Sequence, residues 1–331
     1  DTEKKEQEIA LLNKDKLMNQ AVIEKQATQK NALTIGGLLV LIIAVISVFA
    51  FISNKKKSNL LSKQVHEINY QNAIIKEKNK DITDSIVYAK RLQEAVFPLT
   101  NELNNYFCES FVLFRPKDIV SGDFYWFEET NNLTYLIVGD STGHGVPGAF
   151  MSILGHNLLN QIILEEKISS PAEILSTLDN RVTKSLNKKG SKEEYNDGMD
   201  IGVCVIDKKS KKLYYSGANR PLIIKRGNEI FELKQNKFAI GGINTKDTKI
   251  FTQHEMDYFE NDIFYLFSDG YYDQFGGPKG KKFKFKQLQE VLLTNANKSM
   301  EDQQKILNET FDAWKGNLEQ VDDVCIIGIR L

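Results

Sequence analysis

The sequence has no excess of charge of either sign and no paired cysteines. Its 43 Lys and Arg residues balance 44 Asp and Glu residues, which gives a net charge of −1. Nucleic-acid binding normally requires a basic surface, so this balance predicts no nucleic-acid partner. The three cysteines, Cys108, Cys204 and Cys325, lie far apart, without a CxxC motif or a neighbouring histidine. They are expected to be small buried residues in a reducing compartment, not disulfide or metal-binding residues.

Charge is absent altogether from residues 31–54. Ala32 to Ile52 is almost wholly apolar, and about 20 such residues cross the hydrocarbon core of a bilayer. We therefore predict a transmembrane helix over 31–54; the core helix of a soluble protein is the alternative. Lys55 to Lys57 follow at once, which places the C-terminal side in the cytoplasm by the positive-inside rule. The predicted location is the inner (cytoplasmic) membrane, spanned once, with the remainder of the chain cytoplasmic.

Residues 1–30 are rich in charge and are expected to form the helical end of a further region. The chain begins at Asp1 without a methionine, so we expect a longer protein with a sensor region before residue 1. With the orientation above, residues 1–30 would lie outside the cytoplasm.

Residues 55–97 are predicted to form a coiled-coil linker, since 58–97 contain neither proline nor glycine. Apolar residues recur there at intervals of seven. A second layer of mixed apolar and polar residues lies four positions later in the sequence, as in a coiled coil. The apolar layer is Leu61, Ile68, Ile75, Ile82, Ala89 and Val96; the mixed layer is Val65, Asn72, Asn79, Ile86 and Gln93. We predict a homo-oligomer through residues 58–97. A single amphipathic helix lying on the following domain is the alternative.

Pro98 ends this helix, and residues 98–331 are predicted to form one α+β domain. Apolar segments joined by short polar turns indicate antiparallel sheets, with helices grouped apart from them. The expected strands are Phe111–Phe114, Gly122–Glu128, Thr134–Val138, Ile201–Ile206, Lys212–Ser216, Pro221–Lys225, Asp262–Phe267 and Val324–Arg330. The expected helices are Gly148–Glu165, Pro171–Asn187, Phe285–Thr294 and Met300–Trp314.

Acidic residues stand at the ends of several of these strands. Asp123 opens one, Asp140 and Asp269 close two others, and the pair Asp322-Asp323 opens the last. Carboxylates that converge at one edge of a sheet repel one another unless a cation lies between them. All-oxygen ligand sets suit Mg²⁺, Mn²⁺ or Ca²⁺, although a single strand-end aspartate is more often a turn residue. The repeated pattern predicts a divalent-metal site.

Four segments, VSGDFYW, GDSTGHGVPGAFM, FSDG and VDDVCIIGI, follow one another in this order. Together they resemble the SpoIIE-type branch of the metal-dependent protein serine/threonine phosphatases (PPM family), over about Phe97 to Leu331. The resemblance implies an αββα sandwich of two antiparallel sheets flanked by helices. It also implies two Mn²⁺ or Mg²⁺ ions and hydrolysis of phosphoserine or phosphothreonine on a protein by a metal-activated water.

The resemblance assigns roles to particular residues. Asp123 would bridge the two ions, and Asp140 would bind the first ion together with the backbone carbonyl of Ser141. Asp269 and Asp322 would hold the second ion.

Other residues near the motifs have open roles. His144 either acts on a metal-bound water or the leaving serine oxygen, or stabilises its loop by a hydrogen bond. The wider family has a phosphate-binding arginine five residues before the bridging aspartate, where this chain has Asp118. Arg115 or Lys117 is then the candidate for binding the substrate phosphate. Asp323 is the less expected metal ligand of its pair.

Glycines and a turn complete the pattern. Gly143 and Gly145 are expected to let the loop after Asp140 fold tightly before a helix, because glycine adopts positive φ readily. The segment SGANRPLII, which contains Arg220, matches the corresponding family segment imperfectly and is interpreted as a structural strand turn.

Two rival functions were weighed against the phosphatase. A sensor kinase has the same order of membrane helix, coil and catalytic domain, but its ATP-binding Asp-x-Gly-x-Gly motif is not found, since Thr142 stands two residues after Asp140. A catalytically inactive phosphatase-like scaffold, acting through its coiled coil, is retained as the alternative. For an active enzyme, fold-level analogy suggests a phosphoprotein substrate similar to an anti-sigma-factor antagonist.

Overall fold

The computed structural model describes residues 2–187, 196–242 and 249–331. The chain contains two compact units, residues 1–80 and 81–331. The first consists of the helix α1 alone, and the second holds the end of α1 and the sheets. The unit that holds the sheets therefore begins at Asp81, inside the predicted coiled-coil segment.

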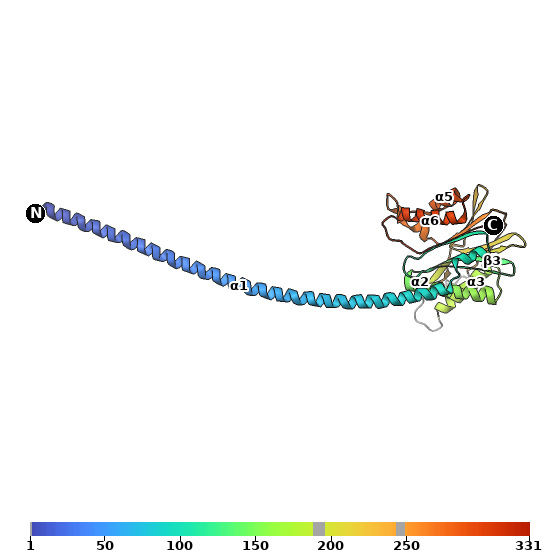
Figure 1. Ribbon diagram of the computed structural model, residues 1–331, viewed down its shortest axis with the longest axis horizontal. Coiled ribbons are helices and arrows are strands. Elements are labelled where there is room, and N and C mark those ends of the chain that lie inside the picture. Colours follow the sequence, from blue (N-terminus) through green and yellow to red (C-terminus); the bar gives the residue numbers. More distant parts are fainter. Residues whose placement is uncertain (1, 188–195, 243–248) are drawn as a thin grey trace. The chain divides into compact units, whose positions relative to one another are not determined.

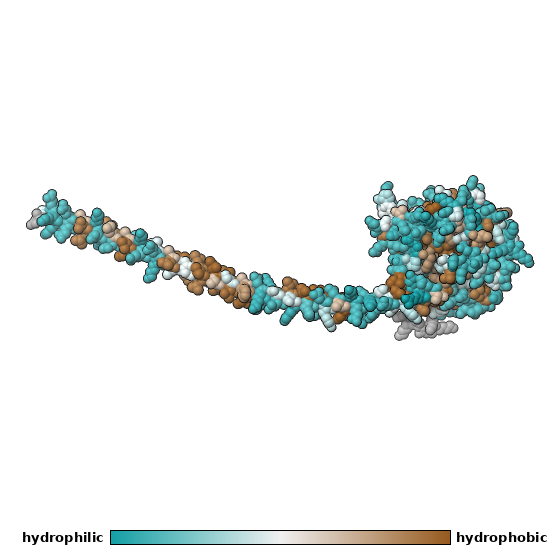
Figure 2. Space-filling model, viewed as in Figure 1, coloured by the Kyte–Doolittle hydropathy of each residue, from teal (hydrophilic) through white to brown (hydrophobic). Residues whose placement is uncertain are grey.

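α1 (Thr2–Val96) is one continuous helix of 95 residues. Its apolar side chains between residues 32 and 52 are exposed, and Figure 2 shows them as a hydrophobic band between hydrophilic stretches. By length and composition, α1 is the one helix in the described residues suited to crossing a membrane. An apolar band that no protein surface covers needs another apolar environment. The structure is therefore compatible with the membrane span, which stays a prediction.

Two antiparallel sheets form the centre of the second unit. The first has the strand order β1-β13-β10-β6-β7 and the second β2-β3-β4-β5-β9, with β8 beside β4. The first sheet contains β1 (Glu109–Arg115), β13 (Val324–Arg330), β10 (Ile263–Phe267), β6 (Leu222–Arg226) and β7 (Glu229–Leu233). The second contains β2 (Asp123–Thr130), β3 (Leu133–Ser141), β4 (Gly198–Asp207), β5 (Lys212–Ala218), β9 (His254–Asp257) and β8 (Ile240–Gly241).

Helices cover the outer faces of both sheets (Figure 1). α2 (Gly145–Leu159) and α3 (Pro171–Leu186) pack on the second sheet, and α6 (Met300–Lys315), beside α5 (Phe285–Asn295), packs on the first. The remaining short elements are η1 (Thr100–Asn105), η2 (Asn160–Glu165), α4 (Gly270–Asp273), β11 (Phe275–Gly276) and β12 (Lys281–Lys282). These layers confirm the predicted αββα sandwich of two antiparallel sheets flanked by helices.

The main core lies between the two sheets. Tyr125 of β2 and Leu136 of β3 belong to one buried cluster with Phe264 of β10 and Ile327 of β13, and the Tyr125 ring packs against Phe114 of β1. A second cluster joins the other face of the first sheet, including Ile326, to α5 and α6. β10 and β13 are thus covered on both faces, which explains why their sequences, IFYLF and VCIIGI, are apolar without alternation.

Every strand and helix expected from the sequence is present, but α2 begins at Gly145, before the expected Gly148. Among the strands of four or more residues, the sequence missed β7 and β9. Both are edge strands whose side chains are all exposed or half-buried. Such strands are held by backbone pairing to one neighbour and lack the apolar pattern that reveals a buried strand.

Candidate active site

Three carboxylates lie side by side at one end of the second sheet. Asp123 at the start of β2 pairs in register with Asp140 near the end of β3. Asp140 pairs in turn with Asp200 near the start of β4. Residues directly opposite each other in an antiparallel pair point to the same face, with Cβ atoms about 4.5–5.5 Å apart. The register of the sheet therefore gathers these three side chains.

The first sheet adds two more carboxylates. Asp269 follows β10 and Asp322 precedes β13, and the two strands are antiparallel neighbours. A pocket of about 210 Å³ is lined by Asp140, Ser141, Thr142, Gly143, His144, Asp200, Arg220, Asp269 and Asp322. Asp123 is only 2% exposed and does not line it. Three of the predicted metal-binding side chains, those of Asp140, Asp269 and Asp322, thus line one pocket, and Asp123 is paired in register with Asp140.

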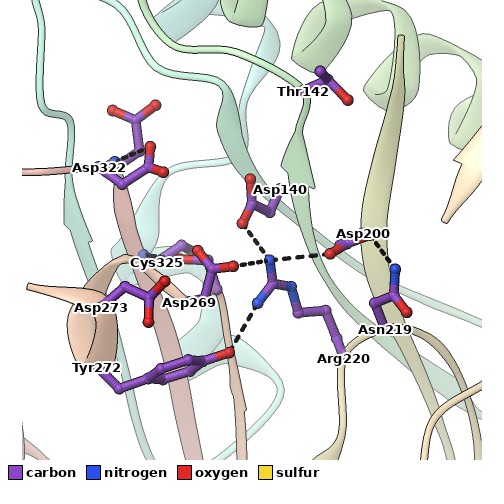
Figure 3. Close-up of polar contacts among 12 residues, drawn as sticks. Asp140, Thr142, Asp200, Asn219, Arg220, Asp269, Tyr272, Asp273, Asp322 and Cys325 are labelled. Atoms are coloured by element: carbon purple, nitrogen blue, oxygen red, sulfur yellow. Dashed lines mark hydrogen bonds and ion pairs between the residues drawn. The ribbon is translucent and has the colours of Figure 1, made fainter. Parts of the chain in front are cut away.

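Arg220 lies in the middle of these carboxylates (Figure 3). Its buried guanidinium donates hydrogen bonds to Asp140 Oδ2 and, at 2.8 Å, to Asp269 Oδ2. The same nitrogen is 3.4 Å from Asp200 Oδ2, and the other terminal nitrogen donates to the Tyr272 hydroxyl at 3.1 Å. One guanidinium therefore joins acidic groups that come from both sheets.

The turn that carries Arg220 depends on Asn219. Asn219 has a φ of 56°, a left-handed conformation that asparagine tolerates better than most residues. Its side-chain amide donates to Asp200 Oδ1 at 2.8 Å. Interpreting this segment as only a structural turn was wrong, because the turn delivers a cation into the pocket.

Positive and negative charges do not balance at this site. A single guanidinium is set against five carboxylates, those of Asp123, Asp140, Asp200, Asp269 and Asp322. Burial raises the pKa of Asp123 well above its ordinary value, and the neighbouring charge of Asp140 raises it further. Burial also raises the pKa of Asp140 to about 8, although Arg220 opposes the shift. Carboxyl groups shifted in this direction lack sufficient positive charge around them.

The oxygen donors of this site fit divalent cations. Asp123 Oδ2 is buried without a hydrogen-bond partner, so a bound cation would supply the interaction that it lacks. Carboxylate and carbonyl oxygens suit Mn²⁺ and Mg²⁺. In residues 2–187, 196–242 and 249–331, however, no three acidic, imidazole or thiol side chains are already gathered to hold an ion. Arg220 holds oxygens of Asp140 and Asp269 instead, and cation binding would compete with it.

The loop between β3 and α2 forms one wall of the pocket. Gly143 and Gly145 have φ values of 83° and 65°, which confirms the positive φ expected of these glycines. The backbone N–H of Thr142 donates to the carbonyl of Gly198 at 2.9 Å and ties the loop to β4. The Ser141 backbone therefore lies at the pocket wall, where its carbonyl is predicted to bind an ion.

His144 lies at the mouth of the pocket, directly before α2. Its Nδ1 is 2.7 Å from Asp118 Oδ2, and the two side chains are 52% and 45% exposed. Asp118 is the residue at the position where the wider family has an arginine. In this chain it contacts the imidazole and can orient it.

The two residues suggested for phosphate binding lie in different places. Arg115 donates to Asn308 Oδ1 at 2.7 Å and to Asp312 Oδ1 at 2.8 Å on α6, and it does not line the pocket. Lys117 is nearer, since its charge acts against the burial that raises the pKa of Asp322. Arg220, not Arg115, is the arginine that the fold brings to the pocket.

The neighbours Asp322 and Asp323 have separate environments. Asp322 lines the pocket. Asp323 is buried, and its two oxygens accept hydrogen bonds from the backbone N–H groups of Lys117 and Gly122, each at 2.7 Å. This arrangement favours Asp322 as a metal ligand and Asp323 as a support for the segment before Asp123.

Sequence reasoning missed two residues of the site. Asp200 precedes the expected strand Ile201–Ile206, the same context that singled out Asp123, so this signal was present in the sequence. Arg220 had no comparable local signal, because its position depends on the pairing of β6 with β10 and on the turn at Asn219.

Comparison with known proteins adds independent evidence. Residues 130–331 match the family described as "Stage II sporulation protein E (SpoIIE)". Stage II sporulation protein E of Bacillus subtilis (strain 168) is 26% identical over 220 residues, which cover 64% of this chain and 24% of that protein. The chain thus spans about a quarter of the length of this curated relative.

Solved structures show the same fold. The SiaA-PP2C domain of Pseudomonas aeruginosa is 31% identical, with a TM-score of 0.69 over 76% of this chain and 98% of that domain. The PP2C phosphatase domain of SpoIIE from Bacillus subtilis, solved with a fragment of its regulatory domain, is 20% identical, with a TM-score of 0.54 over 67% of this chain and 63% of that chain. From the family match and the 31% identical structural relative, this chain belongs to the SpoIIE family and contains a PP2C-type phosphatase domain.

Proposed function

We propose that this chain is a signalling phosphatase that hydrolyses phosphoserine or phosphothreonine on a protein substrate and depends on Mn²⁺ or Mg²⁺. The observation that carries the proposal is the in-register row Asp123, Asp140 and Asp200, of which Asp140 and Asp200 line one pocket with Asp269 and Asp322 of the other sheet. Five acidic groups with one guanidinium leave a net negative charge that a pair of divalent cations would balance.

The residues that would hold the ions are those predicted from the sequence. Asp123 would bridge them; Asp140 and the Ser141 carbonyl would bind one, and Asp269 and Asp322 the other. Two such ions, when bound, lower the pKa of a water molecule and direct it at phosphorus.

Arg220 would act on charge within the same pocket. It is buried, and a guanidinium stays protonated at all physiological pH values. Released from Asp140 or Asp269, its nitrogens would be able to donate to phosphoryl oxygens, a geometry that guanidinium groups favour. Lys117 is the second candidate for this role; the contacts of Arg115 with α6 argue against Arg115.

His144 would transfer a proton at the edge of the pocket. With its Nδ1–H directed at Asp118 Oδ2, its Nε2 is the nitrogen left to exchange a proton with the leaving serine oxygen or with water.

We also propose that the enzyme is anchored in the inner membrane by residues 31–54, with the phosphatase domain in the cytoplasm. The exposed apolar band of α1 and the following lysines support this topology. The substrate would be a cytoplasmic phosphoprotein similar to a small anti-sigma-factor antagonist. Self-association would use the exposed part of the predicted coiled coil, from Leu61 to Ile82, since Gln93 is buried and Val96 packs on the domain's main core. It would bring two or more domains together.

The test uses the 331-residue chain in nanodiscs, with a phosphoserine peptide and p-nitrophenyl phosphate as substrates. We expect phosphate release that requires Mn²⁺ or Mg²⁺ and stops with EDTA. No release with either ion, from a preparation whose thermal unfolding is cooperative, would favour the alternative, an inactive scaffold that acts through its coil.

A further inference from the structure

Residues 276–286 concentrate positive charge in a chain whose net charge is −1. They contain no acidic residue and five lysines, namely Lys279, Lys281, Lys282, Lys284 and Lys286, all of them exposed. The segment includes the paired strands β11 and β12 and the start of α5, and residues 275–286 are named the lysine hairpin. A surface of one charge sign attracts a partner of the opposite sign.

One of these lysines is paired with an acidic residue. Lys282 Nζ lies 2.8 Å from Asp273 Oδ2. Within residues 2–187, 196–242 and 249–331, the ammonium groups of the other four make no ion pair and no hydrogen bond. Four of the five positive charges are therefore available to a partner.

Buried contacts hold the lysine hairpin in one place. The N–H of Gly277 donates to the carbonyl of Trp314 in α6 at 2.8 Å, and the Trp314 indole donates to the carbonyl of Gln274 at 3.1 Å. Phe283 is buried, and its ring meets the Trp314 ring edge to face, with the centroids 5.2 Å apart. The lysines therefore extend from a fixed framework, and a partner would not have to order the backbone beneath them.

The lysine hairpin follows the pocket residue Asp269 after one short helix. α4 comes directly after Asp269, and Figure 3 shows its residues Tyr272 and Asp273 beside Asp269. The Tyr272 hydroxyl accepts from Arg220 in the pocket at 3.1 Å. The Tyr272 carbonyl accepts from the N–H of Lys284 at 2.7 Å. One residue thus contacts the arginine of the pocket with its side chain and the lysine hairpin with its backbone.

The segment that leads into Asp322 is attached at the same point. Gln274 is fully buried between α4 and β11. Its amide donates to the carbonyl of Glu319 at 3.0 Å and accepts from the N–H of Val321 at 2.9 Å. Asp322 is the next residue, and it lines the pocket together with Asp269. The lysine hairpin is therefore fixed to both segments that carry the predicted ligands of the second ion.

A phosphoprotein needs positive charge near this pocket. Carboxylates outnumber positive groups in the pocket, and a phosphoserine carries a charge of about −2 at neutral pH. Lysines at the edge of such a pocket attract an approaching acidic segment and raise the rate of productive encounter. Anionic lipid headgroups have the same sign of charge. The attachment of the lysine hairpin to two pocket segments favours the substrate.

We propose that the lysine hairpin is a docking surface for the protein substrate and selects phosphoproteins that have aspartate or glutamate close to the phosphoserine. This deepens the proposed function and rests on it. The lysines contact acidic side chains of the substrate and not the phosphoryl group, so they act on capture of the substrate. Contacts between exposed charges are weak one by one and are screened by salt. Selection therefore depends on several lysines together and is lost at high ionic strength.

The test compares two phosphoserine peptides of equal length with the full chain in phosphatidylcholine nanodiscs. Glutamates flank the phosphoserine in one peptide, and glutamines replace them in the other. The variant is Lys281→Gln/Lys284→Gln. Its matched control is Lys209→Gln/Lys211→Gln, because these two lysines are also exposed and lie at the opposite end of β4 from Asp200. Lys211 and Lys284 also share a positive φ, 56° and 75°.

We expect Lys281→Gln/Lys284→Gln to lower kcat/KM for the glutamate peptide about fivefold, through KM, as the loss of two surface charge contacts would. Its hydrolysis of the glutamine peptide and of p-nitrophenyl phosphate should stay within about twofold of the wild type. The control variant should match the wild type on all three substrates. High salt should remove the preference of the wild type for the glutamate peptide. Asp273→Asn, which frees Lys282, should increase that preference.

Three results would overturn the inference. One is an equal loss for both peptides, which would mean that the lysines support the fold. Another is a Lys281→Gln/Lys284→Gln variant that matches the wild type on both. The third is an effect seen only in nanodiscs that contain phosphatidylserine, which would assign the lysines to lipid headgroups. If the wild type hydrolyses neither peptide nor p-nitrophenyl phosphate, the proposed function fails. Fluorescence anisotropy of the labelled glutamate peptide with the wild type and the variant then decides whether the surface binds acidic segments.

Discussion

β6 and β10 have an arginine–aspartate contact at each end, and the two contacts differ. At one end, Arg226 donates to both oxygens of Asp262, with three hydrogen bonds of 2.6 to 3.0 Å. At the other end, Arg220 precedes β6 and meets Asp269, which follows β10. Arg220 is shared with Asp140 and with a further aspartate of β4, whereas Arg226 has one carboxylate to itself.

The difference separates structure from function within one pair of strands. A one-to-one pair with bidentate geometry satisfies both charges and needs no further ligand. At the pocket end, buried and half-buried carboxylates outnumber the guanidinium, and the pKa of Asp140 is raised to about 8 by burial. A surplus of like charge that is partly removed from water costs stability and is kept where a bound cation or substrate makes use of it.

The largest expected effect is on catalysis at the pocket end. Asp123→Asn and Asp269→Asn should each lower kcat by about 100-fold or more, because each removes a ligand from a site that stabilises developing charge. Steady-state hydrolysis of p-nitrophenyl phosphate at saturating Mn²⁺ measures this. The matched control is Asp273→Asn, whose half-buried carboxylate pairs with Lys282 at 2.8 Å instead of facing the pocket. Near-normal rates in either site variant would remove the catalytic assignment.

At the other end of β6 and β10, where Arg226 pairs with Asp262, we expect a change in the free energy of unfolding instead of a change in catalysis. Asp262→Asn leaves Arg226 without its partner, and breaking a pair of this kind costs about 3 kcal/mol. Asp269→Asn should cost the metal-free chain much less, since it removes one charge from a surplus. Denaturant unfolding of the metal-free chain measures both variants, and the activity per folded molecule of Asp262→Asn should stay near that of the wild type. Equal destabilisation by the two substitutions would show that the ends are alike.

The pH dependence of the protein's stability should reveal the excess of carboxylates at the pocket directly. The folded pKa of Asp140, about 8, exceeds its ordinary value of 3.8, so the folded chain binds more protons than the unfolded chain between these values. Stability of the metal-free protein should then fall as pH rises from 5 to 8, by at most about 1.4 kcal/mol per unit for such a group. Melting temperatures in EDTA and in Mn²⁺ test this. The same downward trend at saturating Mn²⁺ would argue that these carboxylates do not bind the ion.

The smallest effect is expected from α1. Four residues inserted after Asn79 change the phase of the exposed coil face relative to the seated turns 86–96, whereas seven residues keep it. We expect the four-residue insertion to lower Mn²⁺-dependent activity a few-fold and the seven-residue insertion to leave it near normal. If neither changes activity or apparent Mn²⁺ affinity, the coil serves only as a tether.

Periodicity and turn residues were sufficient to predict an α+β domain with antiparallel sheets, because β10 and β13 are apolar throughout and α3, α5 and α6 are amphipathic. The sandwich itself was implied by the resemblance to the phosphatase family. The strand-end rule located Asp123, Asp140, Asp269 and Asp322. It did not locate Arg220, whose place among them follows from how two distant strands pair. Nor does a heptad pattern reveal where its partner lies: the layers that end in Gln93 and Val96 meet the chain's own domain. Side-chain placement of this kind depends on tertiary contacts that no local pattern contains.

The most direct test of the account counts the ions. Isothermal titration of the full chain with Mn²⁺ should give two ions per chain for the wild type and for Asp262→Asn, and fewer than two for Asp123→Asn. A wild-type chain that binds none, or an Asp123→Asn chain that still binds two with unchanged affinity, would contradict the claim that the surplus of carboxylates at the pocket end is a two-metal site.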